Sequence, residues 1–340
     1  MRTFRKAALI LSVNILVVVI MVLAFAQPSV VKVLLKEAKS GDYDTLFLGQ
    51  SHGETSMNPY VFSNEMGVDA LNLNRRLMPL EDIYYLLLEA NKNECFKMVV
   101  LDIDPSYWSG SFSAECGKDT NLFPYLTGYR RLSYVAELLW KQKWNNVLFD
   151  YEIGKTTVLR SPKVVQSKLN WAYVSGSEDS IRTTFECLGI SKTYRYEGRG
   201  FRYGFEKSGI SWPTWTFVVD SILDEKIAVF EQIVEYCREK NIELVCVQSA
   251  LPPYRLRNEN MDVVHDYFTQ LCDDNGVCFI DMNYARGLHQ VDDEYVDLDG
   301  HMMGQLAERH TKLLCDALKA EDRDVFFYET FGEVLEGLEK

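Results

Sequence analysis

Ser51 is the residue of this chain best placed for nucleophilic chemistry. It follows the apolar, strand-like run 43–48, and Gly49 allows the chain to turn sharply so that a helix begins at Ser51. The backbone N–H groups and the positive end of that helix would stabilise an alkoxide or an oxyanion. The placement therefore predicts a nucleophile, and a plain helix N-cap is the competing explanation.

A serine hydroxyl needs a base, and His301 is the best candidate among the five histidines. Two carboxylates, Asp297 and Asp299, precede it within four residues, in a loop just before the last predicted helix. A carboxylate on Nδ1 would orient the ring and leave Nε2 to accept the Ser51 proton. His52 adjoins the serine, but sequence neighbours point in different directions, so we expect it to shape the pocket.

These residues need a scaffold that brings two distant loops together. Strand-like runs are expected at 43–48, 68–73, 98–103, 242–248 and 277–281, and helices at 80–90, 225–239, 261–272 and 303–318. The alternation of strands and helices predicts an α/β fold with a doubly wound parallel sheet covered on both faces. Ligands bind at the carboxyl ends of such strands, which is where the Ser51 turn lies.

The first 27 residues are expected to anchor the chain in a membrane. Residues 7–26 contain no charge, and a helix of about 20 residues spans about 30 Å, the thickness of a bilayer core. The basic residues Arg2, Arg5 and Lys6 predict that the chain after position 27 is extracytoplasmic. Secretion after cleavage of a signal peptide at Ala24-Phe25-Ala26 is the alternative. Residues 28–42 are expected to form a stalk.

The composition argues against several classes of function. The 340 residues carry 36 Lys and Arg against 49 Asp and Glu, a net charge of −13, whereas nucleic-acid binding needs a basic face. No glycine-rich phosphate loop is present, so no nucleotide cofactor is expected. The eight cysteines form no CxxC pair and no compact His/Asp spacing occurs, so no metal is expected. Export would allow disulfides, while Cys246 and Cys278 fit buried apolar positions.

Two segments fall outside the alternating pattern. Residues 105–222 are rich in Trp, Tyr and Phe and form an insertion between the third and fourth strands, with a helical patch at 132–143. Aromatic rings beside Arg and Gly could stack on sugars, although packing explains aromatic residues more often. Residues 321–340 form an acidic tail, which we expect to be a surface appendage of the domain 43–320.

The motif Gly49-Gln50-Ser51-His52, together with the late loop Asp297-Leu298-Asp299-Gly300-His301-Met302, resembles the SGNH/GDSL hydrolase superfamily. Among its branches, the chain resembles the membrane-anchored, outward-facing proteins of teichoic-acid D-alanylation and alginate O-acetylation. The resemblance covers about residues 43–104 and 225–318. It implies a flavodoxin-like three-layer α/β/α fold, with Ser51 as the nucleophile and His301 as the base.

Some positions depart from the pattern of that family. The family usually places its acid three residues before the histidine, where this chain has Leu298; of the two flanking acids we favour Asp299 over Asp297. The backbone N–H of Ser51 is expected to be an oxyanion donor. Asn74 stands near the place of the family's oxyanion glycine and is expected to be a second donor.

Arg75 and Arg76 follow the second strand and are expected to steer an anionic polymer or acyl donor, with a solvated surface pair as the alternative. The sequence thus predicts an outward-facing serine esterase or O-acyltransferase that forms an acyl-Ser51 intermediate and acts on acyl esters of cell-surface glycans. The expected partners are a cell-envelope glycan, an acyl donor and a membrane-bound O-acyltransferase. The alternative is a non-catalytic protein that binds a glycan or acts as a scaffold.

Overall fold

Five parallel strands form the central sheet of the computed structural model, which describes residues 2–25, 30–109, 122, 126–140, 176–209, 213–288 and 291–338. The strands are β1 (Thr45–Leu48), β2 (Ala70–Asn72), β3 (Met98–Asp102), β6 (Glu243–Gln248) and β7 (Cys278–Asp281). They lie in the order β2-β1-β3-β6-β7, with every neighbouring pair parallel. Flavodoxin-like doubly wound sheets have this order. The predicted α/β class and parallel sheet are confirmed.

The side chains of the strands alternate between two apolar layers. Leu46 of β1 and Val99 of β3 are paired in register and are buried in one layer. The next pair along the two strands, Phe47 and Val100, is buried in the other layer. Because neither face of the sheet meets water, the strands are nearly continuous apolar runs, which is why the sequence reveals them.

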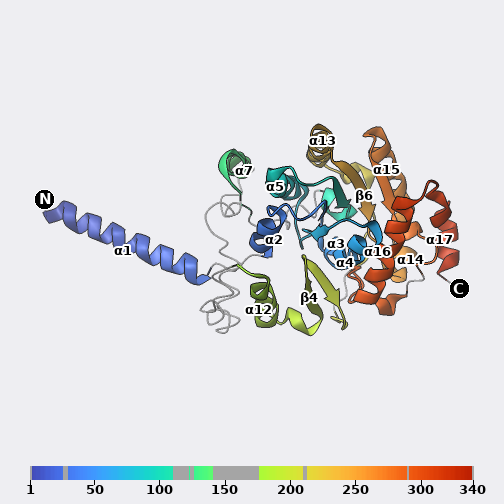
Figure 1. The fold of residues 1–340 in the computed structure, drawn as a ribbon, viewed down its shortest axis with the longest axis horizontal. Coiled ribbons are helices and arrows are strands. Elements are labelled where there is room, and N and C mark those ends of the chain that lie inside the picture. The colour runs from blue at the N-terminus through green and yellow to red at the C-terminus, as the bar shows by residue number, and fades with distance from the viewer. Residues whose placement is uncertain are drawn as a thin grey trace.

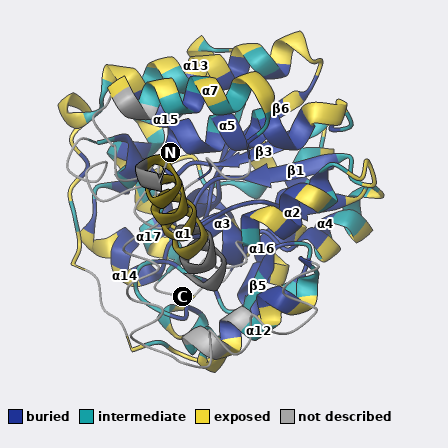
Figure 2. Cartoon of the chain, turned by 90° about the vertical axis from the view of Figure 1, so that its left-hand side faces the viewer, coloured by how far each residue is buried: buried dark blue, intermediate teal, exposed yellow. Residues whose placement is uncertain are grey.

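Helices cover both faces of the sheet. One face packs against α2 (Val30–Ala38), α5 (Leu80–Ala90), α13 (Asp224–Glu239) and α15 (Met261–Asp274). The other packs against α4 (Pro59–Met66) and α16 (Gly304–Lys319), while the short α3 (Ser51–Ser56) and α14 (Pro253–Asn258) follow β1 and β6. Figures 1 and 2 show the buried strands lying between these helices. The arrangement is compatible with a three-layer fold.

The N-terminal helix α1 (Arg2–Phe25) extends away from the rest of the chain (Figure 1). Its side chains are described at residues 4–6 and 8–17, and the large apolar ones among them are 47 to 79% exposed. Across the described residues, no helix combines the length and the apolar character that crossing a membrane requires.

Residues 30–38, in the segment expected to form a stalk, pack against the domain. In α2, Val31, Leu34, Leu35 and Ala38 are buried in the core layer that contains α5. Apolar residues at intervals of three and four give a helix one apolar face, and this face is covered by the domain. Residues 30–38 therefore belong to the folded domain and not to a stalk.

The described parts of the expected insertion form α7 (Gly128–Trp140), α12 (Glu178–Leu188) and an antiparallel hairpin of β4 (Tyr194–Gly198) and β5 (Phe201–Gly204). The helical patch expected at 132–143 corresponds to α7, with 141–143 outside the described residues. The hairpin packs against α3, where Arg202 Nη1 lies 3.0 Å from Glu54 Oε2. The insertion thus contacts the helix that begins at Ser51.

The acidic tail also packs against the domain. Its helix α17 (Phe331–Gly337) begins with a capping box made by Thr330 and Glu333, and Val334 is buried. The backbone N–H of Tyr328 donates to the carbonyl oxygen of Tyr284, just beyond β7, at 2.8 Å. The tail is therefore part of the fold rather than a free appendage.

Six of the cysteines are free thiols in the described part of the chain: Cys95, Cys237, Cys246, Cys272, Cys278 and Cys315. Cys246 is fully buried, as its place in an apolar strand predicts, and Cys278 is half-buried. Burial raises the pKa of both thiols, so they remain protonated at neutral pH. Cys246 acts as a small apolar residue of the core, whereas the Cys278 sulfur accepts a hydrogen bond from Arg323.

His310 lies on α16 and is fully buried. Burial penalises the charged imidazolium and lowers the pKa of His310 to about 3. The same side chain in the unfolded chain takes up a proton near pH 6.5. Between these two values the unfolded chain holds one more proton at this position than the folded chain.

Replacing His310→Leu should therefore flatten the pH dependence of stability in acid. His310 should contribute a fall in the free energy of unfolding that approaches about 1.4 kcal/mol per pH unit well below pH 6.5, because protons favour the unfolded chain at this position. The leucine variant lacks this contribution. Denaturant unfolding at pH 6.5, 5.5 and 4.5 measures both slopes, and equal slopes for the two proteins would contradict the prediction.

Candidate functional site

The site begins where β1 ends and the chain turns into α3. Gly49 adopts φ +143°, a conformation that L side chains rarely adopt. A Cβ at this position would lie 2.6 Å from the Cβ of Asp102 and 2.7 Å from its carbonyl oxygen. Only glycine fits, and α3 then begins at Ser51, as the sequence predicts.

Asp102, at the end of β3, fixes the start of α3. Its Oδ2 accepts the N–H of Gly53 at 3.0 Å, and its Oδ1 accepts the hydroxyl of Ser249, just after β6, at 2.7 Å. Burial of the carboxyl group raises the pKa of Asp102 to about 6. One buried group thereby ties together α3 and the carboxyl ends of two strands.

His301 is held by Asp297. Both carboxylate oxygens of Asp297 lie 2.9 Å from His301 Nδ1. Burial alone would lower the pKa of His301, but the charge and the hydrogen bond of Asp297 outweigh burial and raise it. Asp297 has a lowered pKa for the reciprocal reason, since His301 outweighs the effect of burial on the carboxylate. The pair has the arrangement of an oriented base and its acid.

The choice of Asp299 as the orienting acid is not supported by this geometry. Arg255 of α14 donates from Nη1 to the Asp299 carbonyl oxygen at 2.7 Å and to Asp299 Oδ1 at 3.2 Å. The backbone turns at Gly300, where φ is +124°. Because of this turn, the Asp299 side chain faces Arg255 and His52 while the Asp297 side chain faces His301.

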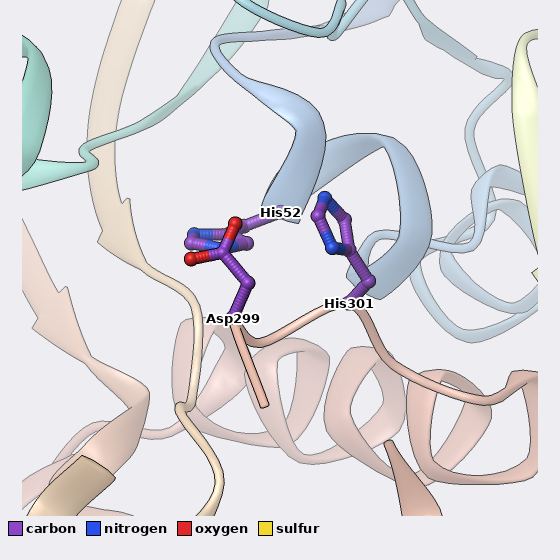
Figure 3. Close-up of side chains that lie close together, drawn as sticks. All are labelled: His52, Asp299 and His301. Carbon is purple, nitrogen blue, oxygen red and sulfur yellow. The ribbon is translucent and has the colours of Figure 1, made fainter. Parts of the chain in front are cut away.

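His52 is more central than the sequence suggests. Its ring centroid lies 5.3 Å from that of His301, its Nδ1 lies 3.3 Å from Asp104 Oδ2, and its Nε2 lies 4.0 Å from Asp299 Oδ2. Figure 3 shows the Asp299 carboxylate beside the His52 ring, with His301 next to them. The sequence could have indicated this cluster, because His52 and Asp104 both follow strands that end at the same edge of the sheet.

Ser51 is buried, with 6% of its surface exposed, and is the first residue of α3. Within the described part of the chain its hydroxyl makes no hydrogen bond, so the predicted contact with His301 is not formed. Its own backbone N–H is at the first turn of the helix, where no intrahelical acceptor exists. The loops that carry Ser51 and His301 do meet, since the His52 and His301 rings are in contact.

Asn74, the expected second oxyanion donor, is fully buried beneath the start of α3. Its Nδ2 donates to Asn72 Oδ1 at 3.0 Å, and a Cβ on Gly53 would lie 2.5 Å from its Oδ1. The amide hydrogens are therefore directed at a neighbouring side chain in the interior. The geometry gives Asn74 a packing role under α3.

The two arginines after β2, Arg75 and Arg76, differ in their exposure to solvent. Arg75 is buried, and its Nη1 donates to Glu54 Oε1 at 2.9 Å. Its charge is neutralised inside the protein, so the prediction that Arg75 steers an anionic substrate is wrong. Arg76 is exposed, as a steering residue or a solvated cation would be.

A small polar pocket adjoins His52. Its lining includes Asp104, Trp215, Gln248, Ser249 and Arg255. Gln248 is buried, yet neither its Oε1 nor its Nε2 has a hydrogen-bond partner among the residues described. A buried amide without partners is costly, and a water molecule in this small pocket would satisfy it. The sequence did not single out Gln248.

Comparison with known proteins finds no matching family model, no significant match among curated proteins and none among solved structures. The resemblance to the SGNH/GDSL superfamily therefore rests on sequence motifs alone. The chemistry of the site has to be inferred from the groups that the fold brings together.

Replacing Asp297→Asn should lower the pKa of His301. The substitution removes both the negative charge and the charged hydrogen bond that raise this pKa, while the burial that lowers it remains. NMR titration of the imidazole resonances measures the change. Asp299→Asn is the matched control and should lower the pKa less, because Asp299 makes no hydrogen bond with His301. An unchanged His301 pKa in Asp297→Asn would contradict this assignment.

Proposed function

We propose that the protein is a serine esterase or O-acyltransferase acting on acyl esters of cell-surface glycans through an acyl-Ser51 intermediate. The observation that supports it best is the Asp297–His301 pair, with 2.9 Å from each carboxylate oxygen to Nδ1, at the sheet edge where Ser51 begins α3. A carboxylate, an imidazole and a serine at a helix start are the parts that acyl transfer requires.

In the proposed reaction, the Ser51 oxygen attacks the ester carbonyl carbon while His301 takes the hydroxyl proton. N–H groups at the start of α3 stabilise the resulting oxyanion. The intermediate expels the alcohol, which receives the proton from His301, and an acyl-Ser51 ester remains. Water or a sugar hydroxyl then attacks this ester and regenerates the serine. The Ser51 hydroxyl has to turn toward His301 when substrate binds, as catalytic contacts often tighten only in the complex.

A second candidate is a non-catalytic relative that holds a glycan or acts as a scaffold for a membrane acyltransferase. Two observations favour it: the Ser51 hydroxyl makes no hydrogen bond among the described residues, and the Asn74 amide is directed at Asn72. In this alternative the protein binds a glycan without changing it.

The proposed location is the outer side of a cell membrane, with α1 as the anchor. The proposal rests on the sequence, namely on the uncharged stretch 7–26 and the basic residues Arg2, Arg5 and Lys6 before it. Anchoring would place the site near a membrane-bound O-acyltransferase that could supply acyl groups. Secretion after cleavage at residue 26 is the competing proposal.

Ser51→Ala should abolish covalent labelling by a fluorophosphonate probe and lower turnover of an aryl acetate, on the order of 10⁴-fold or more, because no other group replaces the nucleophile. Gel-based labelling and a chromogenic assay measure the two effects. Ser56→Ala is the matched control, because it removes a serine hydroxyl at the other end of α3, where the hydroxyl is already paired with that of Ser249 at 2.8 Å. The control should keep its labelling, and equal labelling of Ser51→Ala would contradict the nucleophile assignment.

The full chain should remain with membranes after an alkaline carbonate wash, because an uncleaved apolar helix resists extraction that removes peripheral proteins. Mass spectrometry of the N-terminus should find the segment before Gln27 intact. A mature chain that begins at Gln27 and is found in the medium would contradict the anchor and support the signal peptide.

A further inference from the structure

Three side chains of the candidate site carry the groups that bind transition metals: the imidazoles of His52 and His301 and the carboxylate of Asp299. One ligand atom of each lies within 4.8 Å of the other two (Figure 3). We propose that these three residues form a binding site for a divalent transition-metal ion of the zinc type. Two imidazoles and one carboxylate form a recurring set for zinc and non-haem iron, with positions left for water.

His52 provides an observation independent of the clustering. Its side chain is 7% exposed, and its Nε2 has no hydrogen-bond partner among the described residues. A buried polar atom without a partner is costly, so the fold holds this nitrogen at a penalty. The nitrogen lies 4.0 Å from Asp299 Oδ2. A cation between the two atoms would satisfy both.

The distance between His52 Nε2 and Asp299 Oδ2 suits a site that closes slightly on its ion, and the three ligand atoms as a set lie within 4.8 Å of one another. Ligands at about 2.0–2.1 Å from a tetrahedral zinc ion are about 3.3 Å from one another. The 4.0 Å between His52 Nε2 and Asp299 Oδ2 is therefore less than about 1 Å too long. Asp299 can make this movement because its side chain is 31% exposed and Arg255 holds only its other carboxylate oxygen, Oδ1.

A further carboxylate lies behind each histidine. Asp297 accepts at Nδ1 of His301, and Asp104 Oδ2 lies 3.3 Å from Nδ1 of His52. Metal-binding imidazoles usually have such a carboxylate on the ring nitrogen that does not touch the metal, where it fixes the ring and raises its basicity. His52 thus has the partner that metal ligation favours, with Asp104 on Nδ1 and Asp299 facing Nε2.

The ligand chemistry and the local charge select the kind of ion. Imidazole nitrogens favour Zn²⁺, Cu²⁺, Ni²⁺ and Fe²⁺, whereas Mg²⁺ and Ca²⁺ favour sites made of oxygen atoms. Three carboxylates, those of Asp104, Asp297 and Asp299, contact the histidines or contribute the ligand, against the two cations Arg255 and Arg202 among the described residues. The excess of negative charge favours a divalent cation.

Binding of a metal ion at these three residues would affect acyl transfer, and this consequence rests on the proposed function. The ion would use the His301 imidazole that the reaction needs as its base. Metal binding and acylation of Ser51 would then exclude each other, and the ion would act as an inhibitor that controls the site.

The proposal is tested by isothermal titration of the full chain with Zn²⁺, after treatment with a chelator and its removal. The wild type should bind one equivalent of Zn²⁺ and give no signal with Mg²⁺. Asp299→Asn and His52→Gln should each weaken Zn²⁺ binding by roughly tenfold or more, since each removes a ligand. Because Asp299 is partly exposed, its variant decides the question even should His52→Gln fail to fold.

His265→Gln is the matched control. His265 lies on α15 and also has a carboxylate on Nδ1, that of Asp281 at 3.0 Å, so its loss removes a comparable pair elsewhere. This variant should bind Zn²⁺ like the wild type, and so should Ser51→Ala, which keeps the binding result separate from the nucleophile assignment. A wild type that does not bind Zn²⁺, or Asp299→Asn with undiminished affinity, would overturn the proposal.

Discussion

The position of the site depends on one buried carboxylate. Asp102 ends β3, accepts a backbone N–H of α3 through Gly53 and accepts the hydroxyl of Ser249 beyond β6. It can approach so closely because Gly49 has no side chain in the way. The turn that carries Ser51 and His52 is therefore fixed to the carboxyl ends of β3 and β6. The loop of His301 meets this turn from the far end of the sequence, and the contact between the two histidine rings is the result.

The main elements of the fold could be predicted because both faces of the sheet are covered, which leaves the strands as apolar runs in the sequence. The prediction of a stalk is wrong for residues 30–38, where Val31, Leu34 and Leu35 have the spacing of a core-facing helix and are buried. The pairing of His301 could not be predicted in the same way. Two aspartates flank one leucine, and the choice between them depends on the turn at Gly300, a three-dimensional property that composition does not reveal.

The same physical setting serves both proposed chemistries. Asp297 orients His301 and strengthens it as a base, and the same contact is typical of a metal-bound histidine. The two proposals differ in the partner of His301: the Ser51 hydroxyl in acyl transfer, or an ion shared with His52 and Asp299. Three carboxylates surround the two histidines, and which of the two proposed chemistries occurs would depend on whether a substrate or a metal ion is bound. Gln248, which lines the pocket beside His52, is a second buried side chain whose polar atoms have no hydrogen-bond partner among the described residues.

Glu54 links the insertion to the helix of the site. Its two oxygens are held by Arg75 at 2.9 Å and by Arg202, on the β4–β5 hairpin, at 3.0 Å, and all three side chains are largely shielded from solvent. Separating a buried acid from one of its two bases is costly, on the order of several kcal/mol. The aromatic segment is consequently not a detachable module. A chimera that exchanges this segment for another would need to bring its own guanidinium to Glu54, which restricts how the region can diversify.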